Sequence, residues 1–140
     1  MPRYVASREL LATRDDVWAF LAEPYNLADW WPGIAGVEPG RRGLTPGARW
    51  QIVGPNQPSY LRRPQMTGTL QVLAVEPYER FAFQLTGDRI EAEVSLSTVR
   101  EDRTKVTVAV SGPWLIGLRR SFPQRALARL YSLCQTAAEA

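Results

Sequence analysis

The chain has 140 residues, of which 45% are hydrophobic and 22% charged, with a net charge of +3, as in a soluble domain spanning residues 1–140. No apolar stretch reaches the about 20 residues that a transmembrane helix needs, and the first nine residues lack the apolar core of a signal peptide, so we expect a cytoplasmic protein. The basic residues are scattered and form no stripe along a predicted helix, which argues against a nucleic-acid partner.

A short amphipathic helix is predicted near the N-terminus. Thr13 is placed to cap it, Val17, Phe20 and Leu21 share one face, and Pro24 ends it. A second, shorter helical turn follows and is broken by a Pro-Gly pair. Two short helices therefore separate the first strand from the rest of the chain.

Residues 3–12 are moderately strand-like, without clean alternation. Residues 34–112 are predicted to be β-structure, because apolar and polar residues alternate between turn residues. The expected strands there are 34–39, 48–53, 66–76, 80–86, 89–100 and 104–111. Such short connections favour an antiparallel meander with one dry face. The proline-rich segment 54–64 is expected to be irregular, either a flap over an opening or a plain surface loop.

The last 27 residues are predicted to be helical. Leu127, Leu130, Tyr131 and Cys134 recur at helical spacing and form an apolar stripe. Pro123 lies inside the pattern, where it either begins the main helix or kinks a longer one that starts near residue 113. We favour the kinked helix.

Several of these segments resemble one known family. They are residues 16–24, Trp30-Trp31-Pro32-Gly33, Gly47-Ala48-Arg49-Trp50 and residues 75–83. They are similar to the SRPBCC superfamily, which includes START-like lipid-transfer domains and polyketide cyclase/dehydrase-like proteins. The resemblance implies an α+β helix-grip fold, with a seven-stranded antiparallel sheet wrapped around a long C-terminal helix and a cavity between them.

One face of the predicted sheet is almost free of ionisable groups, since Glu91 and Glu93 fall on the opposite parity. A concave apolar face suits a hydrophobic ligand oriented by a few polar tips, for which Tyr60, Thr98, Tyr131 and the indole N–H groups are candidates. The predicted ligand-binding residues are Trp30, Trp50, Ile52, Tyr60, Met66, Leu70, Phe83, Val94, Trp114 and Tyr131. The alternative is that these side chains simply fill the core.

The pair Trp30-Trp31 has three interpretations: core anchors, part of the cavity mouth, or an exposed patch that touches a membrane or partner. The chain contains no histidine, which removes the commonest general base and metal ligand. Cys134 lacks a histidine partner and is interpreted as a small buried hydrophobe. No catalytic residue, metal site or cofactor is predicted.

The leading hypothesis is a non-catalytic binding or carrier module for a lipid, a quinone or a polyketide-like aromatic. The alternative is a cyclase/dehydrase-like enzyme that acts by positioning plus one polar donor. The donor would be Arg49, Tyr60, Arg62, Arg63 or Tyr131. A third hypothesis is a protein-interaction module resembling the co-chaperone-like branch of the family. Peripheral membrane contact, a monomer and a homodimer all stay open.

Overall fold

The computed structural model describes residues 3–31, 34, 36–53, 66–86, 89–112 and 122–139, with the side chains of 53, 66–68 and 135–139 outside that description. Its elements follow one another as β1 Arg3–Leu10, α1 Arg14–Ala22, the 3-10 helix η1 Pro24–Asn26, α2 Leu27–Trp30, β2 Gly36–Pro39, β3 Arg49–Val53, β4 Met66–Glu76, β5 Arg80–Leu85, β6 Ile90–Arg100, β7 Arg103–Ser111 and α3 Phe122–Glu139. This order agrees with the predicted one.

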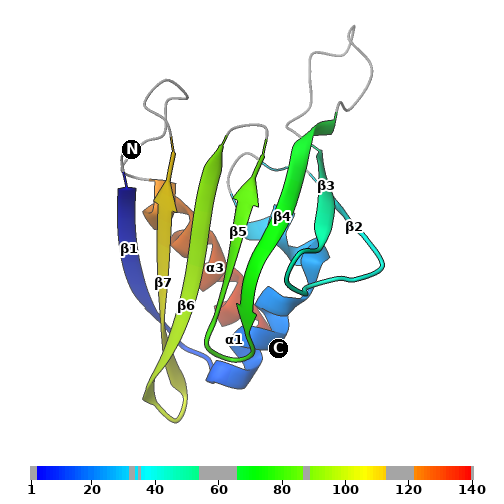
Figure 1. Ribbon diagram of the computed structural model, residues 1–140. Coiled ribbons are helices and arrows are strands. Elements are labelled where there is room, and N and C mark those ends of the chain that lie inside the picture. The colour runs from blue at the N-terminus through cyan, green and yellow to red at the C-terminus, as the bar shows by residue number, and fades with distance from the viewer. Residues whose placement is uncertain are drawn as a thin grey trace, which may run out of the picture.

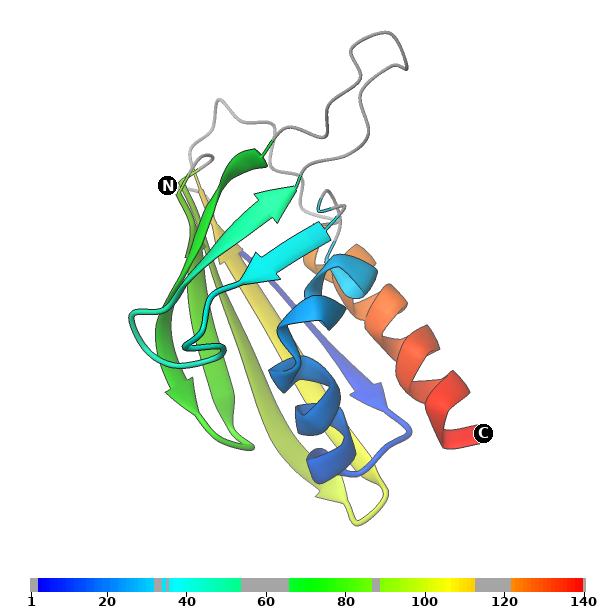
Figure 2. The same ribbon diagram turned by 90° about the vertical axis from the view of Figure 1, so that its right-hand side faces the viewer.

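The seven strands form one antiparallel sheet in the order β1-β7-β6-β5-β4-β3-β2. The helices all lie on one side of it (Figures 1 and 2). Helix α3 contacts β1 and β7, and α1 contacts β6 and β7. The predicted α+β helix-grip fold, a sheet wrapped around the C-terminal helix, is therefore confirmed.

The two faces of the sheet separate apolar from polar residues, as the period-two pattern predicts. In β5, Phe81, Phe83 and Leu85 are buried while the residues between them are only partly so. In β6, Glu91 is exposed and lies on the outer face, opposite to its buried neighbours. A shift of one residue would expose this whole apolar set, so burial fixes the register.

The N-terminal helices follow local capping rules. The Thr13 side chain accepts a hydrogen bond from the Asp16 backbone N–H at 3.1 Å. Pro24 does not lead into a loop; it opens η1, where its fixed φ suits a first turn. The Asn26 side chain then donates to the Phe20 carbonyl at 2.9 Å. The single second turn that the sequence predicts is thus two consecutive pieces, η1 and α2.

Helix α3 buries the predicted stripe, including Leu127, Leu130 and Cys134. Pro123 lies in the first turn of the helix as described. The favoured longer helix beginning near residue 113 falls on residues 113–121, outside the described residues. None of the described helices is long and apolar enough to cross a membrane.

Candidate functional site

The helix-facing side of the sheet brings most of the predicted ligand-binding residues together. Trp30, Trp50, Leu70, Phe83 and Val94 are each at most 2% exposed, and Ile52 is 5% exposed. They come from α2 and four different strands, yet they belong to one connected apolar cluster. The structure therefore gathers these six side chains in the interior.

The other four predicted residues stand apart. Tyr131 is half-buried on α3, and the Arg8 guanidinium of β1 lies 4.0 Å from the centre of its ring, a cation–π contact. Met66 begins β4, but its side chain is outside the description. Tyr60 and Trp114 also lie outside the described residues. A ligand-binding role for the ten residues stays a prediction.

An aromatic cluster connects the helices to the sheet. Trp31 makes edge-to-face contacts with Trp30 at 5.4 Å, Phe83 at 5.2 Å and Phe122 at 5.1 Å between ring centres. Phe83 stacks on Phe81 at 5.7 Å. Both tryptophans of the pair are 1% exposed, which supports the core-anchor interpretation and excludes an exposed patch. Trp31 was not among the predicted site residues, although its neighbour was.

Packing differs between the middle and the ends of the interior. A side chain that borders a void wide enough for water keeps accessible surface, and Val94 and Val108, which pair in the middle of the sheet, keep none. Leu85 and Ile90, which pair at one end of the sheet, are 9% and 8% exposed. Leu96 and Trp18, towards the other end of the sheet, are each 7% exposed. Residual access therefore occurs towards both ends but is local, since Leu70, which pairs with Leu85, keeps none.

The polar groups of the described interior are already satisfied. Thr104 is fully buried and its hydroxyl donates to the Ala12 carbonyl at 2.9 Å. The Trp50 indole N–H donates to the Gly43 carbonyl at 2.8 Å. Thr98, expected to be an inward polar tip, is exposed. Among the described residues, no buried side-chain nitrogen or oxygen lacks a hydrogen-bond partner.

The thiol of Cys134 is held in its neutral form. Burial raises its pKa to about 11, and the negative charge of Asp16 contributes in the same direction. A thiol is a nucleophile only as the thiolate, so Cys134 is inert at neutral pH. In the described part of the chain, no group of three or more Cys, Asp or Glu side chains gathers as metal ligands would.

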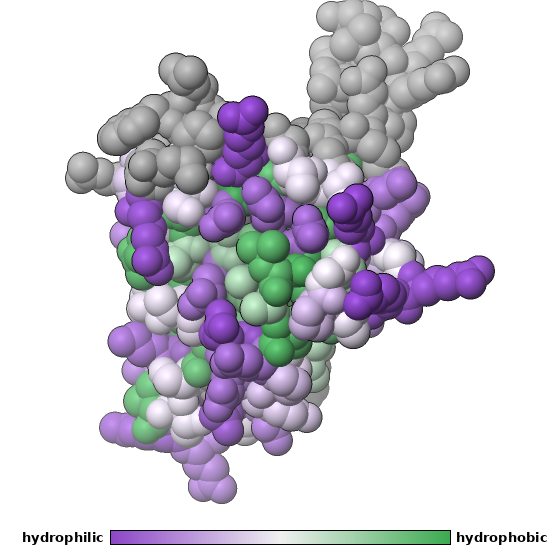
Figure 3. All heavy atoms as spheres, in the orientation of Figure 1, coloured by the Kyte–Doolittle hydropathy of each residue, from purple (hydrophilic) through white to green (hydrophobic). Residues whose placement is uncertain are grey.

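The outer face of the sheet is predominantly hydrophilic, with a small hydrophobic area over the middle strands (Figure 3). A shallow hollow of about 230 Å³ lies there, bordered by Leu73, Ala82 and Ala109 and by the acids Glu91 and Glu93. It is a surface depression on the side of the sheet away from the helices.

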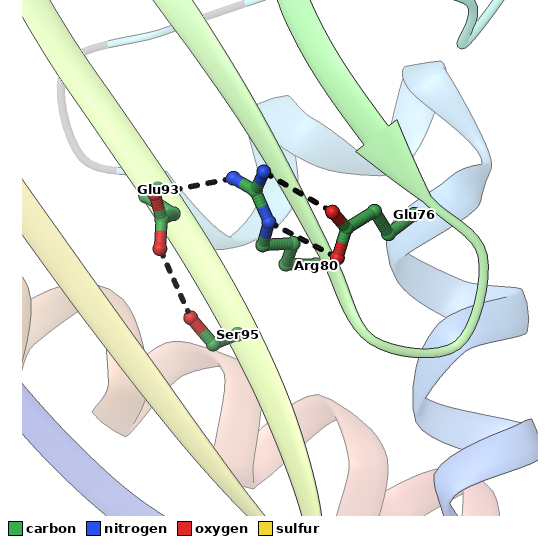
Figure 4. A network of polar contacts seen from close by, with 4 residues as sticks. All are labelled: Glu76, Arg80, Glu93 and Ser95. Carbon is green, nitrogen blue, oxygen red and sulfur yellow. Dashed lines mark hydrogen bonds and ion pairs between the residues drawn. The ribbon is translucent and has the colours of Figure 1, made fainter.

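Next to this hollow, Arg80 connects two strands through ion pairs to Glu76 at 3.2 Å and Glu93 at 3.4 Å (Figure 4). The hydrogen bond and charge of Glu76, with a smaller contribution from Glu93, raise the pKa of the Arg80 guanidinium. The side chains are partly exposed, and Ser95 donates to Glu93 at 3.4 Å. The charged groups of this network pair with one another on the outer surface, so none of them points into the interior as a catalytic group.

Comparison with known proteins identifies both family and fold. The model of the family described as Activator of Hsp90 ATPase homolog 1-like protein matches residues 11–127. No curated protein matches the chain significantly.

Solved structures with this fold share little sequence with the chain. Protein XoxI from Bacillus cereus is 10% identical with a TM-score of 0.73, and the match covers 99% of each chain. A protein from Nitrosospira multiformis is 15% identical with a TM-score of 0.70, over 99% of this chain and 100% of that one. The di-domain ARO/CYC protein BexL of the BE-7585A biosynthetic pathway is 16% identical with a TM-score of 0.71, over 100% of this chain and 48% of BexL. At such identities the likeness concerns the fold.

Proposed function

Since this chain belongs to the Activator of Hsp90 ATPase homolog 1-like family, within the SRPBCC superfamily, we propose that it binds or carries a hydrophobic small molecule. The ligand class is a lipid, a quinone or a polyketide-like aromatic. One observation carries the proposal: the described side of the sheet that faces the helices holds apolar side chains and no unpaired polar group. A cytoplasmic location for a one-domain protein is part of this proposal and rests on the sequence alone.

The apolar lining restricts the chemistry of the ligand. An ionised group without a partner is costly to bury, and no cation or acid of the described chain is buried in this interior. The buried portion of the ligand is therefore neutral, and any charged group stays at an opening. A preformed apolar site gains affinity from contact area and uses polar groups mainly for orientation.

We place the entrance at the end of the sheet where Leu85 pairs with Ile90. These two inward side chains keep more accessible surface than those in the middle of the sheet. Strand β3 ends and strand β4 begins at this same end, where Val53 pairs with Met66. A ligand entering here meets apolar side chains without first crossing the close-packed middle.

A binding assay with one matched control tests this placement. Nile red, a neutral probe, is titrated into the protein and then displaced by menadione, lauric acid or an anthraquinone. We expect saturable binding with micromolar affinity. Leu85→Phe narrows the entrance and weakens binding by about tenfold, which is about 1.4 kcal/mol. Leu96→Phe, on the same face towards the other end of β6, leaves affinity unchanged.

Native mass spectrometry of the purified protein gives an independent readout, because a carried molecule adds its mass to the chain. Absence of saturable binding for every probe, together with marked destabilisation of Leu85→Phe by overpacking, contradicts the proposal. If Leu85→Phe and Leu96→Phe weaken probe binding equally, the entrance is not at the Leu85 end, but the interior still binds the probe.

No specific observation favours the cyclase alternative. Of the candidate donors, Arg49 is exposed, Tyr131 stacks with Arg8, and Tyr60, Arg62 and Arg63 lie outside the described residues. The likeness to BexL supports the fold alone. The protein-interaction alternative needs a large exposed apolar patch, whereas the described exposed aliphatic side chains, Val5, Leu73 and Val99, come from three separate strands.

A further inference from the structure

The two edges of the sheet differ in how they are protected. At one edge, β2 has four residues and ends in Pro39, which cannot donate a ladder hydrogen bond. At the other edge, β1 has eight residues with neither proline nor lysine. Figure 1 shows β1 as the outermost strand, paired only with β7. Its outer row of backbone N–H and C=O groups is a template for another strand.

We propose that this edge pairs with β1 of a second copy of the chain, antiparallel and around a two-fold axis at Ala6. A closed two-fold dimer places each residue opposite its symmetry-related counterpart. With Ala6 opposite Ala6, the register sets Arg3 opposite Glu9, Tyr4 opposite Arg8, and Val5 opposite Ser7. Both sheets then continue as one, with their outer faces on the same side.

The charges of β1 complement themselves in this register alone. Residues directly opposite each other share a face of the sheet, so the paired numbers must have the same parity. Shifting the axis to Val5 sets Arg3 opposite Ser7, and shifting it to Ser7 sets Val5 opposite Glu9. Only the axis at Ala6 gives each copy an ion pair and a cation–π pair across the new contact.

The existing contacts of these residues leave room for the second copy. Glu9 pairs with Arg103 at 3.5 Å, and both side chains are half-exposed, so a second cation can approach the carboxylate. The Arg8 guanidinium has one face on the Tyr131 ring. Arg8 is exposed, so in the proposed dimer its other face would receive Tyr4 of the second copy. Val5 is 56% exposed, and the pairing would cover it.

Sedimentation velocity over a concentration series tests the dimer with a charge exchange. We expect reversible dimerisation with a dissociation constant of about 10–100 µM, because the strand contact is smaller than the about 1,200 Å² of standard interfaces. Arg3→Glu and Glu9→Arg each bring like charges together at two symmetric sites and weaken the dimer by at least about tenfold. The double variant regains most of the lost affinity because it exchanges the charges across the contact, although Arg103 lacks its Glu9 partner in it as in Glu9→Arg alone.

The rescue has only one physical origin. Arg3 and Glu9 are six residues apart in one strand, about 20 Å, so they cannot pair within a copy. The double variant also keeps the net charge of the wild type. Arg41→Glu and Glu79→Arg make the same charge changes at exposed positions away from β1 and leave the dimer unchanged. Circular dichroism confirms that each variant is folded.

A cross-link gives a second measurement. Opposed residues of antiparallel strands have Cα atoms about 4.5–5.5 Å apart, within the range a disulfide spans. Ala6→Cys, oxidised with copper–phenanthroline, is therefore expected to yield a covalent dimer. Ser97→Cys on β6 and the wild type, whose Cys134 is buried, yield none. A wild type that stays monomeric to about 500 µM, or a double variant that is not rescued, overturns the proposal.

Discussion

Replacing Trp31 by alanine tests whether the aromatic cluster is what fastens the helices to the sheet. The indole is 1% exposed and contacts rings from three elements: Trp30 of α2, Phe83 of β5 and Phe122 of α3. Removing it leaves all three neighbours without a partner on one side. The close-packed surroundings cannot collapse fully into the space.

The expected loss of unfolding free energy is about 3–5 kcal/mol, the range for truncating a buried tryptophan. A chain of 140 residues unfolds with an entropy of roughly 0.3 kcal/mol/K near its midpoint. The corresponding fall in Tm is about 10–17 °C. Trp31→Phe keeps an aromatic ring at this position, so its unfolding free energy falls less than that of Trp31→Ala.

Urea unfolding followed by far-UV circular dichroism is the suitable measurement, because tryptophan fluorescence changes with the substitution itself. Tyr25→Ala is the matched control: it removes an aromatic ring from the same region, but that ring is 64% exposed. The control shifts the unfolding free energy by less than about 0.5 kcal/mol. A loss below about 1 kcal/mol for Trp31→Ala, at an unchanged m-value, refutes the assignment of Trp31 to a close-packed core.

Three further variants probe other parts of the fold. Thr104→Val leaves the partly buried Ala12 carbonyl without its 2.9 Å donor and lowers the free energy of urea unfolding by about 1–3 kcal/mol. Thr104→Ser keeps the hydroxyl and lowers this free energy much less. Tyr78 has φ +67, so Tyr78→Gly is expected to be about 1 kcal/mol more stable than Tyr78→Ala, and equal stabilities would argue against strain there. The Cys134 pKa is raised from 9.0 to about 11, so the native thiol resists Ellman's reagent at pH 8 until the chain is unfolded. Because the thiol of the unfolded chain ionises at lower pH than the native one, the free energy of unfolding falls between about pH 9 and 11. Cys134→Ala removes the contribution of this thiol to that fall.

The strands could be predicted closely because their information is local. Alternation over 80–86 predicts β5, observed at Arg80–Leu85. The contacts that join distant elements carry no such signal: Arg8 meets Tyr131, and Trp31 meets Phe122, across most of the chain. Whether a residue is at an odd or even position of a strand also predicts which face of the sheet it occupies. It does not predict how much of that face the helices cover.

The threonine pair of β6 and β7 illustrates this limit. Thr98 and Thr104 are directly opposite, so they share the inner face. Thr104 is buried because the chain between β1 and α1 passes over it, and the Ala12 carbonyl of that segment accepts a hydrogen bond from its hydroxyl. Thr98 is exposed. The sequence therefore predicts both side chains on the inner face, while only the tertiary arrangement decides which of them is covered.

If the chain binds a hydrophobic molecule as proposed, the aromatic contacts that stabilise the fold also limit the size of that ligand. Trp31 joins α3 to the sheet through Phe122 and Phe83, so an extended chain passing between helix and sheet would have to separate these rings. Each pair is worth about 0.5–1.5 kcal/mol beyond its buried area, and that energy is subtracted from binding. A compact ligand at the Leu85–Ile90 end displaces none of them. We therefore expect menadione to displace Nile red more effectively per apolar atom than lauric acid does. In Trp31→Phe, the difference between the two ligands should be smaller. Tighter binding of lauric acid per apolar atom would mean that the ligand does not enter beside this cluster.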